Sequence, residues 1–156
     1  MLTPVKKKTW NAQASAFAVV ASRYNTRYVD GMLMAAMREL KRARAQSIQV
    51  VRVPGAYEIP VVVARLLEGR RAWAGIICLG VIIRGETVHA RQIGDAVSAS
   101  LARLQIQSGV PVIHEVLLLE NEAQARTRCL GKTHNRGAEA AQTALEMARV
   151  MASLEC

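Results

Sequence analysis

Two short stretches decide the expected fold: VPGAYEIP at residues 53–60 and GVIIRGETVH at residues 80–89. Each follows a run of apolar, largely β-branched residues and interrupts it with Gly, Pro, Glu, Thr, Arg or His. Continuous apolar runs are typical of strands buried on both faces of a parallel sheet. Ligands of open α/β sheets bind at the carboxyl ends of the strands. The two interruptions therefore predict one site built from two strand ends.

The remaining sequence alternates between strand-length apolar runs and segments of helical periodicity. Strands are expected at residues 17–21, 48–53, 75–79 and 112–119. Helices are expected at residues 29–40, 59–67, 93–104, 121–129 and 137–153. This order predicts an α/β fold, a three-layer α/β/α sandwich with a four-stranded parallel sheet, flavodoxin-like, and helices on both faces.

Length and composition indicate a single domain over residues 1–156, with residues 1–15 as an extended N-terminal arm. Hydrophobic residues make up 51% of the 156 positions, which is enough for a full core. The cysteines at 78, 129 and 156 have no zinc or redox spacing, so we expect reduced thiols in a cytoplasmic protein and no metal site. No apolar run reaches the length that spans a membrane.

The chain carries a formal net charge of +9. Its basic residues are dispersed, and no aromatic residues alternate with them as a base-stacking surface would require. We therefore expect no nucleic-acid partner. A few of these cations would be enough to bind a phosphorylated small molecule.

The residues themselves leave several roles open. The loop around Gly85 and Thr87 has donors for a phosphate, but it also fits a strand-to-helix loop with a capping Thr. His89 can exchange protons near neutral pH or be an ordinary surface residue. Glu58 can accept hydrogen bonds from hydroxyl groups or simply place a negative charge at the start of a helix.

Further blocks, taken in order with the two stretches, resemble the lumazine synthase family. They are SRYN at 22–25, GVPVI at 109–113, EN at 120–121 with QA at 124–125, and NRG at 135–137. The resemblance extends from about Ala18 into the last helix. It implies a transferase of riboflavin biosynthesis that condenses 5-amino-6-(D-ribitylamino)uracil with 3,4-dihydroxy-2-butanone 4-phosphate to 6,7-dimethyl-8-ribityllumazine. The family uses no metal and no organic cofactor.

The resemblance also implies roles for individual residues. His89 matches the proposed general acid/base. The ribitylaminouracil would be bound by Tyr24, Ala56, Tyr57, Glu58, Val81, Ile82, Ile83, His114 and Arg136. The phosphate of the second substrate would be bound by Glu86, Thr87 and Arg128.

Two of these positions depart from the family pattern. Arg136 stands where the family usually has Lys, and His114 where Phe is common. Arg and Lys differ at close contacts. A polar ring at His114 would add a hydrogen bond or a second titrating group beside the uracil. We therefore expect these two positions to alter substrate affinity and pH dependence more than the reaction itself.

The family forms homopentamers whose sites lie between neighbouring subunits, and some pentamers build an icosahedral capsid. The turn at residues 130–136 carries no insertion of the kind associated with stopping at the pentamer, so a capsid is allowed. Two other functions remain open: a shell-forming container with lost catalysis, and a flavodoxin-like module that binds a flavin or lumazine without turnover.

Overall fold

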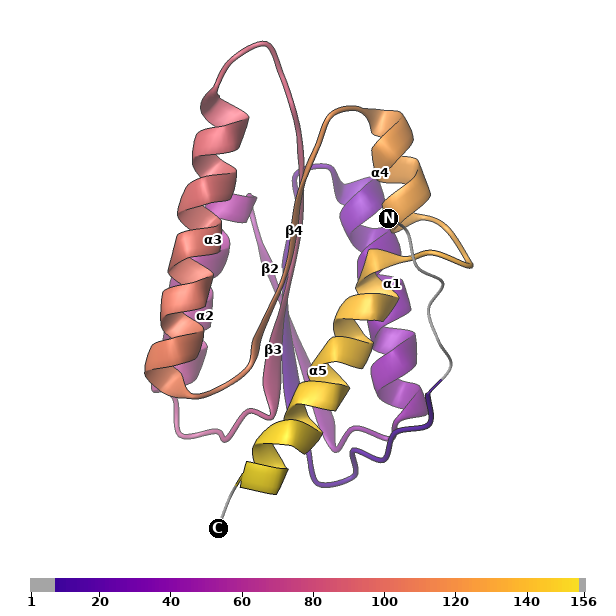
Figure 1. The fold of residues 1–156 in the computed structure, drawn as a ribbon, viewed down its shortest axis with the longest axis vertical. Helices are drawn as coiled ribbons and strands as arrows, with labels where there is room; N and C mark the ends of the chain where they lie inside the picture. Colours follow the sequence, from indigo (N-terminus) through magenta and orange to yellow (C-terminus); the bar gives the residue numbers. More distant parts are fainter. Residues whose placement is uncertain (1–7, 155–156) are drawn as a thin grey trace.

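A parallel sheet with strand order β2-β1-β3-β4 lies between two layers of helices in the computed structural model, which describes residues 8–154 (Figure 1). The strands are β1 (Ala16–Ser22), β2 (Ser47–Val53), β3 (Gly75–Ile83) and β4 (Val112–Leu119). One face is covered by α1 (Thr26–Arg42), α4 (Glu122–Cys129) and α5 (Arg136–Leu154). The other face is covered by the short 3-10 helix η1 (Ala56–Glu58), α2 (Ile59–Glu68) and α3 (His89–Ser108). The predicted α/β fold is confirmed.

Strand β1 shows why the central strands are apolar at every position. Phe17 and Val19 face the core under α1 and α5, whereas Ala18 and Val20 face the core under α2 and α3. All four side chains are 0% exposed. A strand covered on both faces needs apolar residues on both, so its sequence does not alternate.

The largest difference from the predicted elements is in β3, which was expected to end at Leu79 and instead reaches Ile83. Gly80 lies inside the strand and does not begin a loop. A Cβ at Gly80 would lie only 3.1 Å from Val116 Cγ1, so the glycine reflects close packing against β4. The β-branched residues 81–83 then continue the ladder against residues 117–119.

The other predicted elements agree with the structure to within a few residues at their ends. The predicted cap of α4 is present, since Asn121 Oδ1 accepts a hydrogen bond from the Gln124 amide at 3.0 Å. η1 was not predicted. Of the expected N-terminal arm, residues 1–7 lie outside the described part of the chain. Residues 8–15 form neither helix nor strand, and Ala12 in this segment is buried.

Candidate active site

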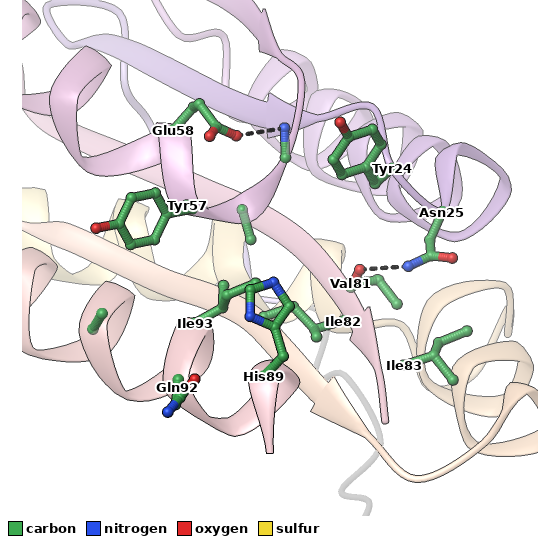
Figure 2. A pocket seen from close by; sticks show the side chains of 13 residues that line it. Tyr24, Asn25, Tyr57, Glu58, Val81, Ile82, Ile83, His89, Gln92 and Ile93 are labelled. Carbon is green, nitrogen blue, oxygen red and sulfur yellow. Dashed lines mark hydrogen bonds between the residues drawn. The ribbon is translucent and has the colours of Figure 1, made fainter. Parts of the chain in front are cut away.

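A cavity of about 680 Å³ opens at the carboxyl ends of β1 and β3, between η1 and the start of α3 (Figure 2). This volume is in the range of small-molecule sites. Tyr24, Ala56, Tyr57 and Glu58 line it from the segments that follow β1 and β2. Val81, Ile82, Ile83 and His89 of the second interruption line the same cavity, so the two interruptions lie together as expected.

The first wall forms where residues 22–25 pack on the VPGAYEIP segment. The amides of Arg23 and Tyr24 both donate to Pro54 O at 3.0 Å. Gly55 makes room for the Tyr24 ring, since a Cβ there would lie 2.9 Å from Tyr24 Cδ2. Tyr24 is nevertheless 68% exposed, so its ring is held in place but open to a ligand.

Glu58 fits both roles left open by the sequence. Its Oε2 accepts a hydrogen bond from the Gly55 amide at 2.9 Å, which fixes the chain before α2 (Figure 2). In the described part of the chain no hydrogen bond is made by Oε1. One carboxylate oxygen is thus structural, and the other remains available to hydroxyl groups in the cavity.

The second wall consists of the end of β3 and the first turns of α3. Val81, Ile82 and Ile83 line the cavity from β3, and His89 lines it as the first residue of α3. The His89 ring is exposed and has no hydrogen-bond partner within residues 8–154. It is therefore positioned by the helix start alone and can contact a ligand from the side opposite Glu58 (Figure 2).

Five further residues that line the cavity were assigned no role from the sequence, and one of them is Gly55, which makes room for the Tyr24 ring. Asn25 donates from Nδ2 to Val81 O at 2.7 Å and so ties the end of β1 to β3. Gln92, Ile93 and Ala96 line the cavity from α3. They follow His89 by three, four and seven residues, so helical periodicity starting at His89 is the signal that would have found them.

Beside this cavity lies a smaller one of about 260 Å³, formed by the loop between β3 and α3. Glu86 and Thr87 line it together with Arg91 and with the ion pair between Arg84 and Glu120. Thr87 Oγ1 accepts a long hydrogen bond, 3.4 Å, from the His89 amide. A loop of this kind before a helix of 20 residues provides backbone donors and a positive dipole end for an anion.

His114, Arg128 and Arg136 do not line either cavity of their own chain. His114 on β4 faces α3, where its ring nitrogens already have partners. Nδ1 accepts from the Val116 amide at 3.2 Å, so Nε2 carries the proton of the neutral ring and donates to Ser98 Oγ at 2.7 Å. Ser98 in turn donates to Gly94 O at 2.8 Å. Burial lowers the pKa of His114, which also favours this neutral form.

The two arginines differ in how strongly they are held. Arg136 donates from Nε to Glu115 Oε1 at 2.6 Å and from Nη1 to Glu139 Oε2 at 2.7 Å. Arg128, in the last turn of α4, is half-buried and has no ion-pair partner within residues 8–154. Its guanidinium is consequently available to an anion from outside the chain.

Residues 8–154 contain no group of three His, Cys, Asp or Glu side chains arranged to hold a metal ion. None of the helices in this range is both long and apolar enough to cross a bilayer.

The geometry agrees with what comparison with known proteins finds. Residues 14–152 match the family model of 6,7-dimethyl-8-ribityllumazine synthase. A protein of that name from Stenotrophomonas maltophilia (strain R551-3) is 38% identical over 144 residues, covering 91% of this chain and 92% of the relative. Another, from Xanthomonas campestris pv. campestris (strain B100), is 39% identical over 137 residues, covering 86% and 88%. The chain belongs to the 6,7-dimethyl-8-ribityllumazine synthase family.

Proposed function

We propose that the protein is a lumazine synthase, which condenses 5-amino-6-(D-ribitylamino)uracil with 3,4-dihydroxy-2-butanone 4-phosphate and releases phosphate and water. The observation that carries the proposal is the shared cavity. Both signature stretches, far apart in the sequence, line one space of about 680 Å³ with an aromatic face, a carboxylate and an imidazole.

The cavity suits a flat heterocycle with a polyol chain. Tyr24 offers a ring face for stacking on the pyrimidine. The end of β3 at Val81, Ile82 and Ile83, which extends beyond the ladder with β1, would offer main-chain groups to the ring edge, although Val81 O is already hydrogen-bonded to Asn25. Ala56, Tyr57 and the unoccupied oxygen of Glu58 would receive the ribityl hydroxyl groups.

The smaller cavity suits the phosphate of the second substrate. Glu86 and Thr87 would bind it through the loop before α3, where backbone donors meet the positive end of the helix dipole. Arg128 would add a charge-assisted, bidentate contact. Because His89 lines the larger cavity and directly follows Thr87 and Val88, which line the smaller one, both substrates would reach the same imidazole.

The reaction then needs orientation and proton transfer. The amine of the uracil attacks the ketone, a first water leaves to form an imine, and phosphate is eliminated. The ribitylamino nitrogen then attacks the remaining carbonyl group, and the ring closes with loss of a second water. Orientation of two reactive substrates supplies much of the acceleration. His89 would move the protons, a contribution of about 10²–10⁴-fold in rate.

We further propose a homopentamer, with an icosahedral assembly of pentamers as the larger form, in the cytoplasm. His114, Arg128 and Arg136 lie outside the cavity of their own chain, which supports a site completed by a neighbouring subunit. The thiols of Cys78 and Cys129 are buried and unpaired, which supports a reducing compartment.

The direct test is to mix purified protein with both substrates and follow the lumazine chromophore. Formation of product at a rate well above the spontaneous condensation is expected. Assembly into a shell without turnover would support the container instead, and retention of a flavin or lumazine without turnover would support the binding module. Light scattering of the same sample separates a pentamer from a capsid.

A further inference from the structure

Glu115 is a buried carboxylate in the middle of β4 that the proposed mechanism does not use. It is only 5% exposed and faces the helix layer of α4 and α5, on the opposite side of the strand from His114. A carboxylate is costly to bury unless it is paired and hydrogen-bonded. Its partner is Arg136, the first residue of α5, through an ion pair of 2.6 Å.

Arg136 is fixed at both ends. Its guanidinium is held by Glu115 from β4 and by Glu139 from α5. Its backbone is held by Asn135, whose Oδ1 accepts from the Gly137 amide at 2.9 Å and whose Nδ2 donates to Cys129 O at 2.8 Å. A long side chain anchored in this way has lost most of its rotamer freedom before any ligand arrives.

The guanidinium still has a free part. Within the described residues no hydrogen bond is made by Nη2, and 37% of the Arg136 side chain is exposed. Two carboxylates around one guanidinium leave the cluster with a net negative charge. This cluster is therefore a poor site for phosphate, but its remaining N–H donors suit an uncharged carbonyl oxygen.

We propose that Glu115 is a positioning residue that aims the free N–H donors of Arg136 at a carbonyl oxygen of the pyrimidine ring bound by the neighbouring subunit. The inference rests on the proposed function. It assigns Glu115 to recognition of the uncharged heterocyclic substrate and leaves recognition of the phosphate to other residues.

The charge of Glu115 adds a pH dependence to this geometry. Burial raises the pKa of Glu115 to about 6, although Arg136 opposes the shift; the negative charge of Glu139 adds to it. Cys129 faces the same group from α4, and burial also raises the pKa of its thiol, so it stays neutral. As the pH falls through about 6, Glu115 gains a proton and its hold on Arg136 weakens.

The test compares Glu115→Gln with the wild-type enzyme, using both substrates separately varied. The variant is expected to raise KM for the aminouracil about 5- to 10-fold, because the charge-assisted hydrogen bond between Glu115 and Arg136 becomes a neutral one and holds the Arg136 donors less firmly. KM for the butanone phosphate and kcat should stay within about twofold of wild type. In the wild-type enzyme the aminouracil KM should rise as the pH falls from about 7 to 5, and in Glu115→Gln this rise should be much smaller.

Two further variants separate positioning from anchoring of α5. In an Arg136→Ala background, Glu115→Gln should add nothing to the aminouracil KM. Glu146→Gln, on the exposed part of α5 and paired with Lys8, is the control expected to change neither KM. Unchanged KM values with a lower melting temperature would show that Glu115 only anchors the helix and would overturn the inference.

The outcome for the wild-type enzyme keeps the two claims apart. Product formation by wild type with an unaffected Glu115→Gln variant overturns this inference and leaves the proposed function intact. Absence of product from wild type overturns the proposed function and this inference with it.

Discussion

The cavity and the β4–α5 region (His114, Glu115 and Arg136) treat their polar side chains in opposite ways. In the cavity, Tyr24 and Tyr57 are 68% and 63% exposed, and the His89 ring has no partner in the described chain. In the β4–α5 region, both ring nitrogens of His114, Oε1 of Glu115, and Nε and Nη1 of Arg136 are already engaged within the described residues, where Nη2 of Arg136 keeps free N–H donors. Free groups can exchange bonds with a substrate during a reaction, whereas engaged groups can only present a fixed surface.

This difference assigns the two regions different tasks. The cavity would carry binding and proton transfer, and the β4–α5 region would present preset donors to the cavity of a neighbouring subunit. Substitutions in the first should change rates and affinities. Those in the second should change protein stability and, through the position of Arg136, the KM for the aminouracil, with little effect on kcat.

The largest effect is expected at His89. His89→Ala should lower kcat by about 10²-fold or more, because general acid–base catalysis is lost while the cavity walls remain. Steady-state kinetics with both substrates measures kcat. The variant His89→Asn should have a similarly low kcat, because an amide does not exchange protons near neutral pH. Turnover within twofold of wild type in His89→Ala would remove His89 from the mechanism.

Gly137 tests how rigidly the β4–α5 region is built. A Cβ at Gly137 would lie 1.9 Å from Met32 O, so Gly137→Ala forces α5 away from α1 and should cost about 3 kcal/mol or more. Urea unfolding at fixed protein concentration measures this. Gly94→Ala is the control, since its Cβ would have ordinary contacts at 3.9 Å and alanine favours a helix by about 0.5–1 kcal/mol. Equal stability of the two variants would contradict the packing.

Arg128 tests the phosphate assignment. Arg128→Ala should raise KM for the butanone phosphate about 10- to 100-fold, the range expected for a lost charge-assisted hydrogen bond. Arg126→Ala on the same helix is the control, because Arg126 is exposed and pairs with Glu122. An equal effect from both variants would indicate a general charge effect in place of a specific contact.

Asn25 tests the tie between the two cavity walls. Asn25→Ala should destabilise the protein by about 1–2 kcal/mol, since it removes the hydrogen bond to Val81 O and places alanine at φ 57°. Asn25→Gly removes the same bond without backbone strain and should cost less. Thermal unfolding of both variants measures the difference, and an Ala variant more stable than the Gly variant would argue against the left-handed backbone.

The smallest effect concerns His114 and pH. The pKa of His114 in the folded state lies below the ordinary value of 6.5, so the imidazole of the unfolded chain takes up a proton at a higher pH than that of the folded chain. The folded state therefore loses stability as the pH falls below about 6.5. His114→Phe should therefore lose less stability than wild type between pH 7.5 and 5. Denaturant unfolding at both pH values checks this, and a steeper loss in the variant would contradict the fixed neutral ring.

The sequence predicts most of the fold because its apolar periods are clear, but it misplaces the end of β3. Glycine is typical of turns, so the sequence predicts that the strand ends before Gly80. Only the close packing of Gly80 against Val116 shows why glycine is needed inside β3. Likewise, the two signature stretches predict a shared site, and spacing from His89 would extend it to Gln92 and Ile93. The bonds of Glu115 and Ser98 could not be predicted, since they depend on the packing of α3 and α5 against β4.

The central claim is that one active site combines the cavity of one subunit with Arg128 on α4 and the β4–α5 region of another. It is tested most directly by co-expressing His89→Ala and Arg128→Ala and assaying at a butanone phosphate concentration well below the wild-type KM, where each variant alone is expected to show about a tenth of wild-type activity or less. If His89 and Arg128 of one site come from different subunits, random mixing leaves about a quarter of the sites intact, and about a quarter of wild-type activity should return. No recovery in verified mixed oligomers would place both residues in the same chain's site and contradict the account.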